Sequence, residues 1–145
     1  MSVRIGLVGA RHMLDAALRK ADEISWPMNV AVVDGGGHLL AFARQDGAIL
    51  AGVDLAARKA RTAVLTAMPT EQLAREAAPD GPLRGIEVTN GGLVIFGGGI
   101  PLAGTDGAVV GAVGVSGGTV EQDVTVARAG ADAFQALRLP EAEHP

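Results

Sequence analysis

Two short glycine-rich segments of this sequence could present backbone N–H groups to a ligand. The first is Gly97-Gly98-Gly99, which is followed by Ile100 and Pro101. One interpretation is a bend between two strands, where glycine supplies the positive φ that other residues avoid. The other is a concave wall in which the amides of Gly98 and Gly99 contact a ligand and polarise its carbonyl. The segment lacks the Lys-Ser/Thr ending of a phosphate-binding loop, so we do not expect a nucleotide there.

The second glycine-rich segment, Ser116-Gly117-Gly118, leads from an expected strand into a helix. The free N–H groups and the dipole at a helix N-terminus favour an anion, such as a ligand carboxylate. The alternative is purely structural. Thr119 and Gln122 have the spacing of a capping box, which would satisfy the same amides without a ligand.

A polar stripe follows one predicted helix, because Lys59, Thr62 and Thr66 recur at i, i+3 and i+7. We expect this stripe to border the apolar face and to overlook a cleft, where Lys59 would pair with an anionic ligand. The alternative is a lysine whose stem covers apolar surface while its ammonium stays in water. Arg58 and Arg61 lie on another side of the helix and are expected to be solvated.

The first predicted hairpin carries His38, Arg44 and Asp46. His38 opens a strand directly after a glycine turn, so its imidazole should be accessible for proton transfer or metal ligation, or be a simple surface group. No HxxxH, HxH or histidine–carboxylate cluster is present, so we expect no protein-ligated metal site.

The elements that must position these residues can be read from hydrophobic periodicity and from glycine and proline. The order is helix, hairpin, two helices, three strands and helix, which predicts an α+β fold with about five strands, mainly antiparallel, flanked by helices. The expected helices span residues 10–24, 53–68, 70–77 and 119–137, and the expected strands span 28–34, 38–44, 92–97, 100–104 and 108–117.

Composition narrows the class of protein. The 145 residues suffice for one domain, covering residues 1–145. Aromatic residues make up 3% and the net charge is −4, which argues against a nucleic-acid partner. Cysteine is absent, so disulfides and thiolate chemistry are excluded. The N-terminal stretch has neither a signal-peptide pattern nor a membrane span, so we expect a cytoplasmic protein without a membrane partner.

Four motifs in this order resemble the GlcG/HbpS family, which includes the C-terminal domain of PduO-type proteins. They are VAVVDGGGHLLAFARQDGA at 30–48, ARKARTAVLTAMPT at 57–70, GGGIPL at 97–102 and GAVGVSGGTVEQDVTVARAG at 111–130. The resemblance implies a profilin-like fold and a homo-oligomer, from a dimer to an octamer.

The resemblance also implies a small-molecule ligand, with haem or a related tetrapyrrole as the first expectation. The alternative is a cofactor-independent enzyme acting on a small organic acid or an aromatic or quinoid metabolite, with His38 or Asp123 as general acid or base. The family pattern and the polar stripe together predict the residues around the pocket: Arg44, Asp46, Lys59, Thr62, Gly98, Gly99, Ser116, Gly117, Gly118 and Asp123.

Overall fold

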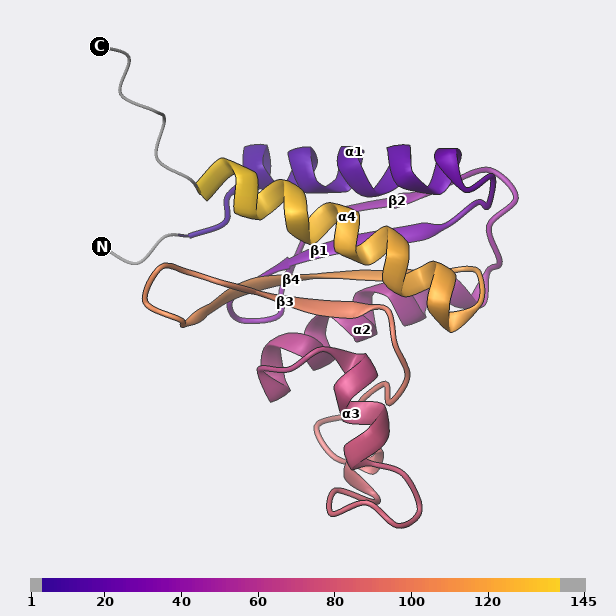
Figure 1. The fold of residues 1–145 in the computed structure, drawn as a ribbon, viewed down its shortest axis with the longest axis vertical. Helices are drawn as coiled ribbons and strands as arrows, with labels where there is room; N and C mark the ends of the chain where they lie inside the picture. Colours follow the sequence, from indigo (N-terminus) through magenta and orange to yellow (C-terminus); the bar gives the residue numbers. More distant parts are fainter. Residues whose placement is uncertain (1–3, 139–145) are drawn as a thin grey trace.

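A four-stranded antiparallel sheet forms the centre of the computed structural model, which describes residues 4–138 (Figure 1). The strand order is β2-β1-β4-β3. Asn29 at the start of β1 pairs with Arg44 of β2 on one side and with Ser116 of β4 on the other. The strands are β1 (Asn29–Asp34), β2 (Leu39–Arg44), β3 (Gly99–Ala103) and β4 (Val109–Ser116).

Helices cover both faces of the sheet, as the sequence predicts (Figure 1). On one face, α1 and α4 pack against alternate valines of the central strands, and on the other face α2 packs against the intervening small residues. This alternation follows from the two-residue period of a strand. The helices are α1 (Leu7–Glu23), α2 (Ala51–Thr66), α3 (Thr70–Glu76) and α4 (Val120–Arg138), with a short 3₁₀ helix at Ile86–Val88.

The contact between α2 and β4 is close enough to exclude a side chain. A Cβ atom at Gly114 would overlap the backbone oxygen of Ala56 and the backbone nitrogen of Ala60. Ala56, Ala60 and Ala63 are fully buried on the same side of α2. The small residues on this face of α2 therefore let its backbone approach the sheet directly.

The expected strand at residues 92–97 does not form, so the sheet has four strands and not five. The backbone N–H of Leu93 donates to Glu87 O at 3.0 Å, and that of Val94 donates to the hydroxyl of Thr62 at 3.1 Å. These hydrogen bonds go to a 3₁₀ turn and a side chain, which leaves no ladder for a fifth strand. Leu93 and Val94 are nonetheless buried, which accounts for the strand-like apolar pattern.

Tight turns join the strands of both hairpins. In the β1–β2 turn the amide of Asp34 donates to His38 O at 2.9 Å and Gly37 has a φ of 81°. In the β3–β4 turn the amide of Gly104 donates to Ala108 O at 2.8 Å. Strand β3 lies at one edge of the sheet, and it carries Pro101.

Among the helices of residues 4–138, none combines the length and the apolar character needed to cross a membrane. The same residues contain no group of three or more His, Asp or Glu side chains placed to hold a metal ion.

Candidate functional site

A hollow of about 570 Å³ lies where the C-terminal end of α1 meets the open end of the β1–β2 hairpin. Helix α1 ends at Glu23, and Ser25 adopts a left-handed φ of 56° that turns the chain sharply toward β1. Two residues predicted from the sequence, Arg44 and Asp46, meet here. The full lining is Ala21, Asp22, Ser25, Trp26, Pro27, Arg44, Gln45 and Asp46.

Trp26 is the only tryptophan of the chain, and its ring is held in a fixed position in this hollow. The indole N–H donates to Gly117 O at 2.8 Å, while Trp26 as a whole remains 47% exposed. A fixed indole with an accessible face is a stacking surface for a flat ligand. The sequence prediction missed Trp26, because a single aromatic residue after a helix has no recognisable spacing.

Gln45 joins the two sides of this hollow. Its Oε1 accepts from the Met28 amide at 2.9 Å, and its Nε2 donates to Asp22 Oδ1 at 3.0 Å. Its neighbours Arg44 and Asp46 are exposed, and neither forms an ion pair with any residue in the described range 4–138. Arg44 therefore keeps its guanidinium donors available for an anion.

The Ser116-Gly117-Gly118 turn supports Trp26 from behind. A Cβ atom at Gly117 would approach Pro27 O to 2.9 Å, so this turn packs directly against the segment that carries the tryptophan. The amide of Gly118 donates to Asp123 Oδ1 at 2.9 Å. The predicted capping box also forms, since the Gln122 amide donates to the Thr119 hydroxyl at 3.2 Å and the Thr119 amide donates to Gln122 Oε1 at 2.9 Å.

Lys59 and Asp123 form a buried ion pair behind this turn. The Lys59 ammonium lies 2.8 Å from Asp123 Oδ2 and donates to Val115 O at 2.9 Å, and the ring of Phe96 lies 5.0 Å from it. Their side chains are 0% and 5% exposed. Burial lowers the pKa of Lys59, although the hydrogen bond that Lys59 donates to Asp123 opposes the shift. Burial raises the pKa of Asp123, and the same hydrogen bond opposes that shift too.

The first glycine-rich segment closes over the same lysine. A Cβ atom at Gly99 would overlap the backbone oxygen of Lys59, and one at Gly98 would come within 2.8 Å of Lys59 Nζ. The Gly99 amide donates to the hydroxyl of Thr70 at 2.9 Å. In the described part of the chain, the close approach that these glycines permit is therefore to α2, its lysine and the backbone of β4 at Val115.

Two of the three residues in the polar stripe predicted for α2 lie within the buried face and not beside it, which corrects the sequence analysis; Thr66, the third, is half-buried. Lys59 and Thr62 are both fully buried, whereas the apolar Val53 on the same helix is 38% exposed. Hydropathy alone places lysine and threonine at a boundary. Here the partners Asp123 and Val94 satisfy them inside the protein.

The other site residues predicted from the sequence lie in different parts of the fold. His38 is exposed at the β1–β2 turn, and Arg44 lies at the other end of the six-residue β2, about 20 Å away at the rise of a strand. Ser116 is buried at the end of β4, where its carbonyl accepts from Asn29 Nδ2 at 3.2 Å. Asp123 is thus brought together with Lys59, Gly117 and Gly118, but His38 is not.

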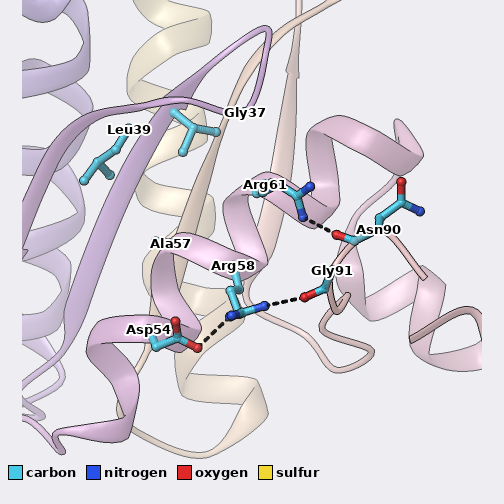
Figure 2. Close-up of a pocket in the computed structure, with 9 residues that line it drawn as sticks. Gly37, Leu39, Asp54, Ala57, Arg58, Arg61, Asn90 and Gly91 are labelled. Atoms are coloured by element: carbon cyan, nitrogen blue, oxygen red, sulfur yellow. Dashed lines mark hydrogen bonds and ion pairs between the residues drawn. The ribbon is translucent and has the colours of Figure 1, made fainter. Parts of the chain in front are cut away.

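A second hollow, of about 370 Å³, lies beside the outer face of α2 (Figure 2). Arg58 and Arg61 contribute to its wall, together with Asn90 and Gly91 of the loop before β3. The sequence analysis expected both arginines to be solvated. The signal that could have placed them is the Asn90-Gly91-Gly92 tripeptide, whose residues all adopt positive φ values that suit Asn and Gly.

These features define an α+β fold in which helices cover both faces of an antiparallel sheet, and comparisons with known proteins give its family. The family model described as "Haem degrading protein HbpS-like" matches residues 5–132 of this chain. The chain belongs to this HbpS-like family, the GlcG/HbpS family expected from the four motifs.

Individual relatives agree with this family. A 15.0 kDa protein of the dhaT-dhaS intergenic region of Citrobacter freundii is 42% identical over 134 residues, covering 92% of this chain and 94% of that protein. The crystal structure of Klebsiella pneumoniae protein ORFY has a TM-score of 0.88 at 38% identity, covering 94% of each chain. A crystal structure of a PduOC:heme complex has a TM-score of 0.84 at 33% identity, covering 90% of this chain and 95% of that one.

Proposed function

We propose that this protein binds haem or a related tetrapyrrole, and that the Trp26 hollow is the site. The observation that carries the proposal is the likeness to a structure solved in complex with heme, at a TM-score of 0.84 over 90% of the chain. The chemistry of the hollow supports it. The half-exposed indole of Trp26 suits a flat macrocycle, and the guanidinium of Arg44, which forms no ion pair within residues 4–138, suits a propionate.

In one subunit this hollow offers Trp26 to the macrocycle and Arg44 to one propionate, but no imidazole is among the residues that line it. The described histidines are His12 and His38, and neither lines this hollow. When bound, haem supplies an iron centre, and the protein's part is to stack, orient and hold its carboxylates. An axial ligand would therefore come from a second copy of the chain.

A second copy also suits the apolar surface beside the hollow. Ile49 and Leu50 follow Asp46 in the same loop and are 52% and 73% exposed. A homo-oligomer, between a dimer and an octamer, would bury them and close the hollow over the macrocycle.

The enzyme alternative is not proposed, because its two candidate groups lie apart. Asp123 is held by Lys59 in the interior, whereas His38 lies at the hairpin turn. Neither arrangement provides an acid and a base around one substrate.

Titration of hemin into the purified protein tests the proposal. We expect a saturable Soret shift, and native mass spectrometry should count haem and subunits together. Arg44→Gln should weaken binding by about tenfold, as expected for one charge-assisted hydrogen bond. The control is Arg75→Gln, because Arg75 lies on α3 and is exposed. Unchanged absorbance at micromolar hemin would refute haem binding, and equal affinity of the two variants would refute this site.

A further inference from the structure

The hollow of Figure 2 differs in chemistry from the Trp26 hollow and lies near the opposite end of the β1–β2 hairpin. Arg58 and Arg61 sit one turn apart on α2, so both guanidinium groups reach the same side of the helix. Ala57 and Leu39 add apolar surface, and the buried Val33 lies beneath them. The site thus combines two cations with an apolar wall.

The loop at residues 90–92 holds both arginines in place. Arg58 Nη1 donates to Gly91 O at 3.0 Å, and Arg61 Nη1 donates to Asn90 O at 2.9 Å (Figure 2). Asn90 and Gly91 have φ values of 55° and 72°, a left-handed conformation that asparagine and glycine tolerate best. The side chains are therefore ordered before any ligand arrives, which reduces the entropy cost of binding.

These hydrogen bonds use only part of the donor capacity. A guanidinium carries five N–H donors. Arg61 has one hydrogen bond to a residue within 4–138. Arg58 Nη1 also reaches Gly92 O at 3.5 Å, and Arg58 Nε lies 2.7 Å from Asp54 Oδ2, so Arg58 Nη2 has no hydrogen-bond partner among these residues. Two positive groups and one carboxylate leave an excess of positive charge in this hollow, in a chain whose net charge is −4. An anion with one negative charge would neutralise this excess positive charge.

The β1–β2 turn keeps the hollow open. Gly37 lines it with a φ of 81°, and a Cβ atom there would approach Arg61 Cγ to 3.2 Å. Glycine therefore satisfies the turn and leaves the space beside the arginine free. The volume of about 370 Å³ lies near the lower end of the range for small-molecule sites.

We infer that this hollow is a second ligand site, which takes a small carboxylate with a flat apolar body, such as an aromatic acid. The carboxylate lies between Arg58 and Arg61, and the apolar body lies against Ala57 and Leu39. A highly charged phosphate ester fits less well, because Asp54 would repel it and the apolar wall would contribute nothing. The inference does not depend on haem binding at Trp26.

Benzoate is the probe, titrated by calorimetry into the full chain, with benzamide and inorganic phosphate in parallel. We expect saturable benzoate binding in the millimolar range or tighter, and at least about tenfold weaker binding of both other compounds. Arg61→Gln and Arg58→Gln should each weaken benzoate about tenfold. Arg11→Gln is the matched control, because Arg11 is exposed on α1, across the sheet from α2. Ala57→Leu should block the apolar wall while keeping both charges.

Each result decides the inference. It is overturned if benzoate fails to bind, if phosphate binds as tightly, or if Arg61→Gln and Arg11→Gln behave alike. Unchanged benzoate affinity in Ala57→Leu would also overturn the inference, because it would mean that the ligand does not contact the apolar wall. Hemin affinity separates the two sites. If hemin binding is lost in Arg61→Gln and kept in Arg44→Gln, the haem site belongs here, and a separate carboxylate site is refuted.

Discussion

Arg58 and Lys59 are neighbours on α2, yet the protein uses their positive charges in opposite ways. Successive residues of a helix point about 100° apart, so one faces the open hollow and the other faces the sheet. Lys59 is buried and paired with Asp123, whereas Arg58 is held by an exposed carboxylate and a loop carbonyl. The difference teaches that the partner of a cationic side chain, and not its residue type, decides whether the cation stabilises the fold or remains available to bind a ligand.

Glycine has a different purpose in the two regions. At Gly99 the missing side chain lets the chain pack against the backbone of α2 and seal Lys59. At Gly91 and Gly92 no close packing against a backbone is present, and glycine instead supplies positive φ values of 72° and 106°. One glycine segment closes a site and the other shapes an open one.

Removing Lys59 should cause the largest loss of stability among these predictions. It tests the buried side of the comparison between Lys59 and Arg58. Lys59→Ala leaves the Asp123 carboxylate buried without its partner, so we expect a loss of about 3–5 kcal/mol in the free energy of unfolding. Arg58→Ala, one residue away, should cost no more than about 1 kcal/mol, because its ion pair is exposed. Urea unfolding measures both.

A double variant separates charge from packing at this pair. Lys59→Met with Asp123→Leu removes both charges, and it should recover much of the loss, since apolar replacements of buried pairs are often neutral. Similar losses for Lys59→Ala and Arg58→Ala would contradict the contrast between the two sides of α2.

A smaller effect should follow from adding one methyl group on the sheet side of α2. Gly114→Ala places a Cβ atom against the backbone of Ala56 and Ala60, so we expect a loss of about 1–3 kcal/mol. Gly9→Ala, in α1 with open space around it, should instead add about 0.5–1 kcal/mol through helix propensity. Thermal unfolding compares them, and equal shifts would mean that α2 does not pack as closely as described.

The smallest effect concerns acid stability at the β1–β2 turn. The backbone hydrogen bond from His38 lowers the pKa of Asp34, whose Oδ1 also accepts from the Gly36 amide at 2.9 Å. A lowered pKa stabilises the fold above the unfolded value of 3.8, and this contribution is lost as the pH falls through the folded value. Asp34→Asn should therefore lose less stability than the wild type between neutral pH and the acid range. Parallel curves from urea unfolding at a series of pH values would contradict this.

Local patterns predicted most of the fold. The helices, the β1–β2 hairpin and the β4 strand follow from periodicity and turn residues, because these signals are contained within a few neighbouring positions. The strand predicted at residues 92–97 was wrong. Buried residues can show a strand-like apolar pattern even when their backbone hydrogen bonds are not made to another strand.

The sites were harder to predict because their contacts join distant residues. Lys59 and Asp123 are 64 positions apart, and Trp26 and Gly117 are 91 apart, so no local spacing reveals either pair. The family pattern marked Lys59 and Asp123, but it could not say that they face each other. Arg58 and Arg61 were set aside because an exposed face looks alike in sequence whether or not a loop folds over it.

Pro101 affects whether a strand of another polypeptide can add to this sheet. It removes a backbone donor from β3, whose outer side has no neighbouring strand in the described sheet. Proline on an outermost strand discourages another chain from adding to the ladder, and with it fibrillar self-association. Strand β2 at the other border has no proline, so any extension of the ladder by another polypeptide is expected there.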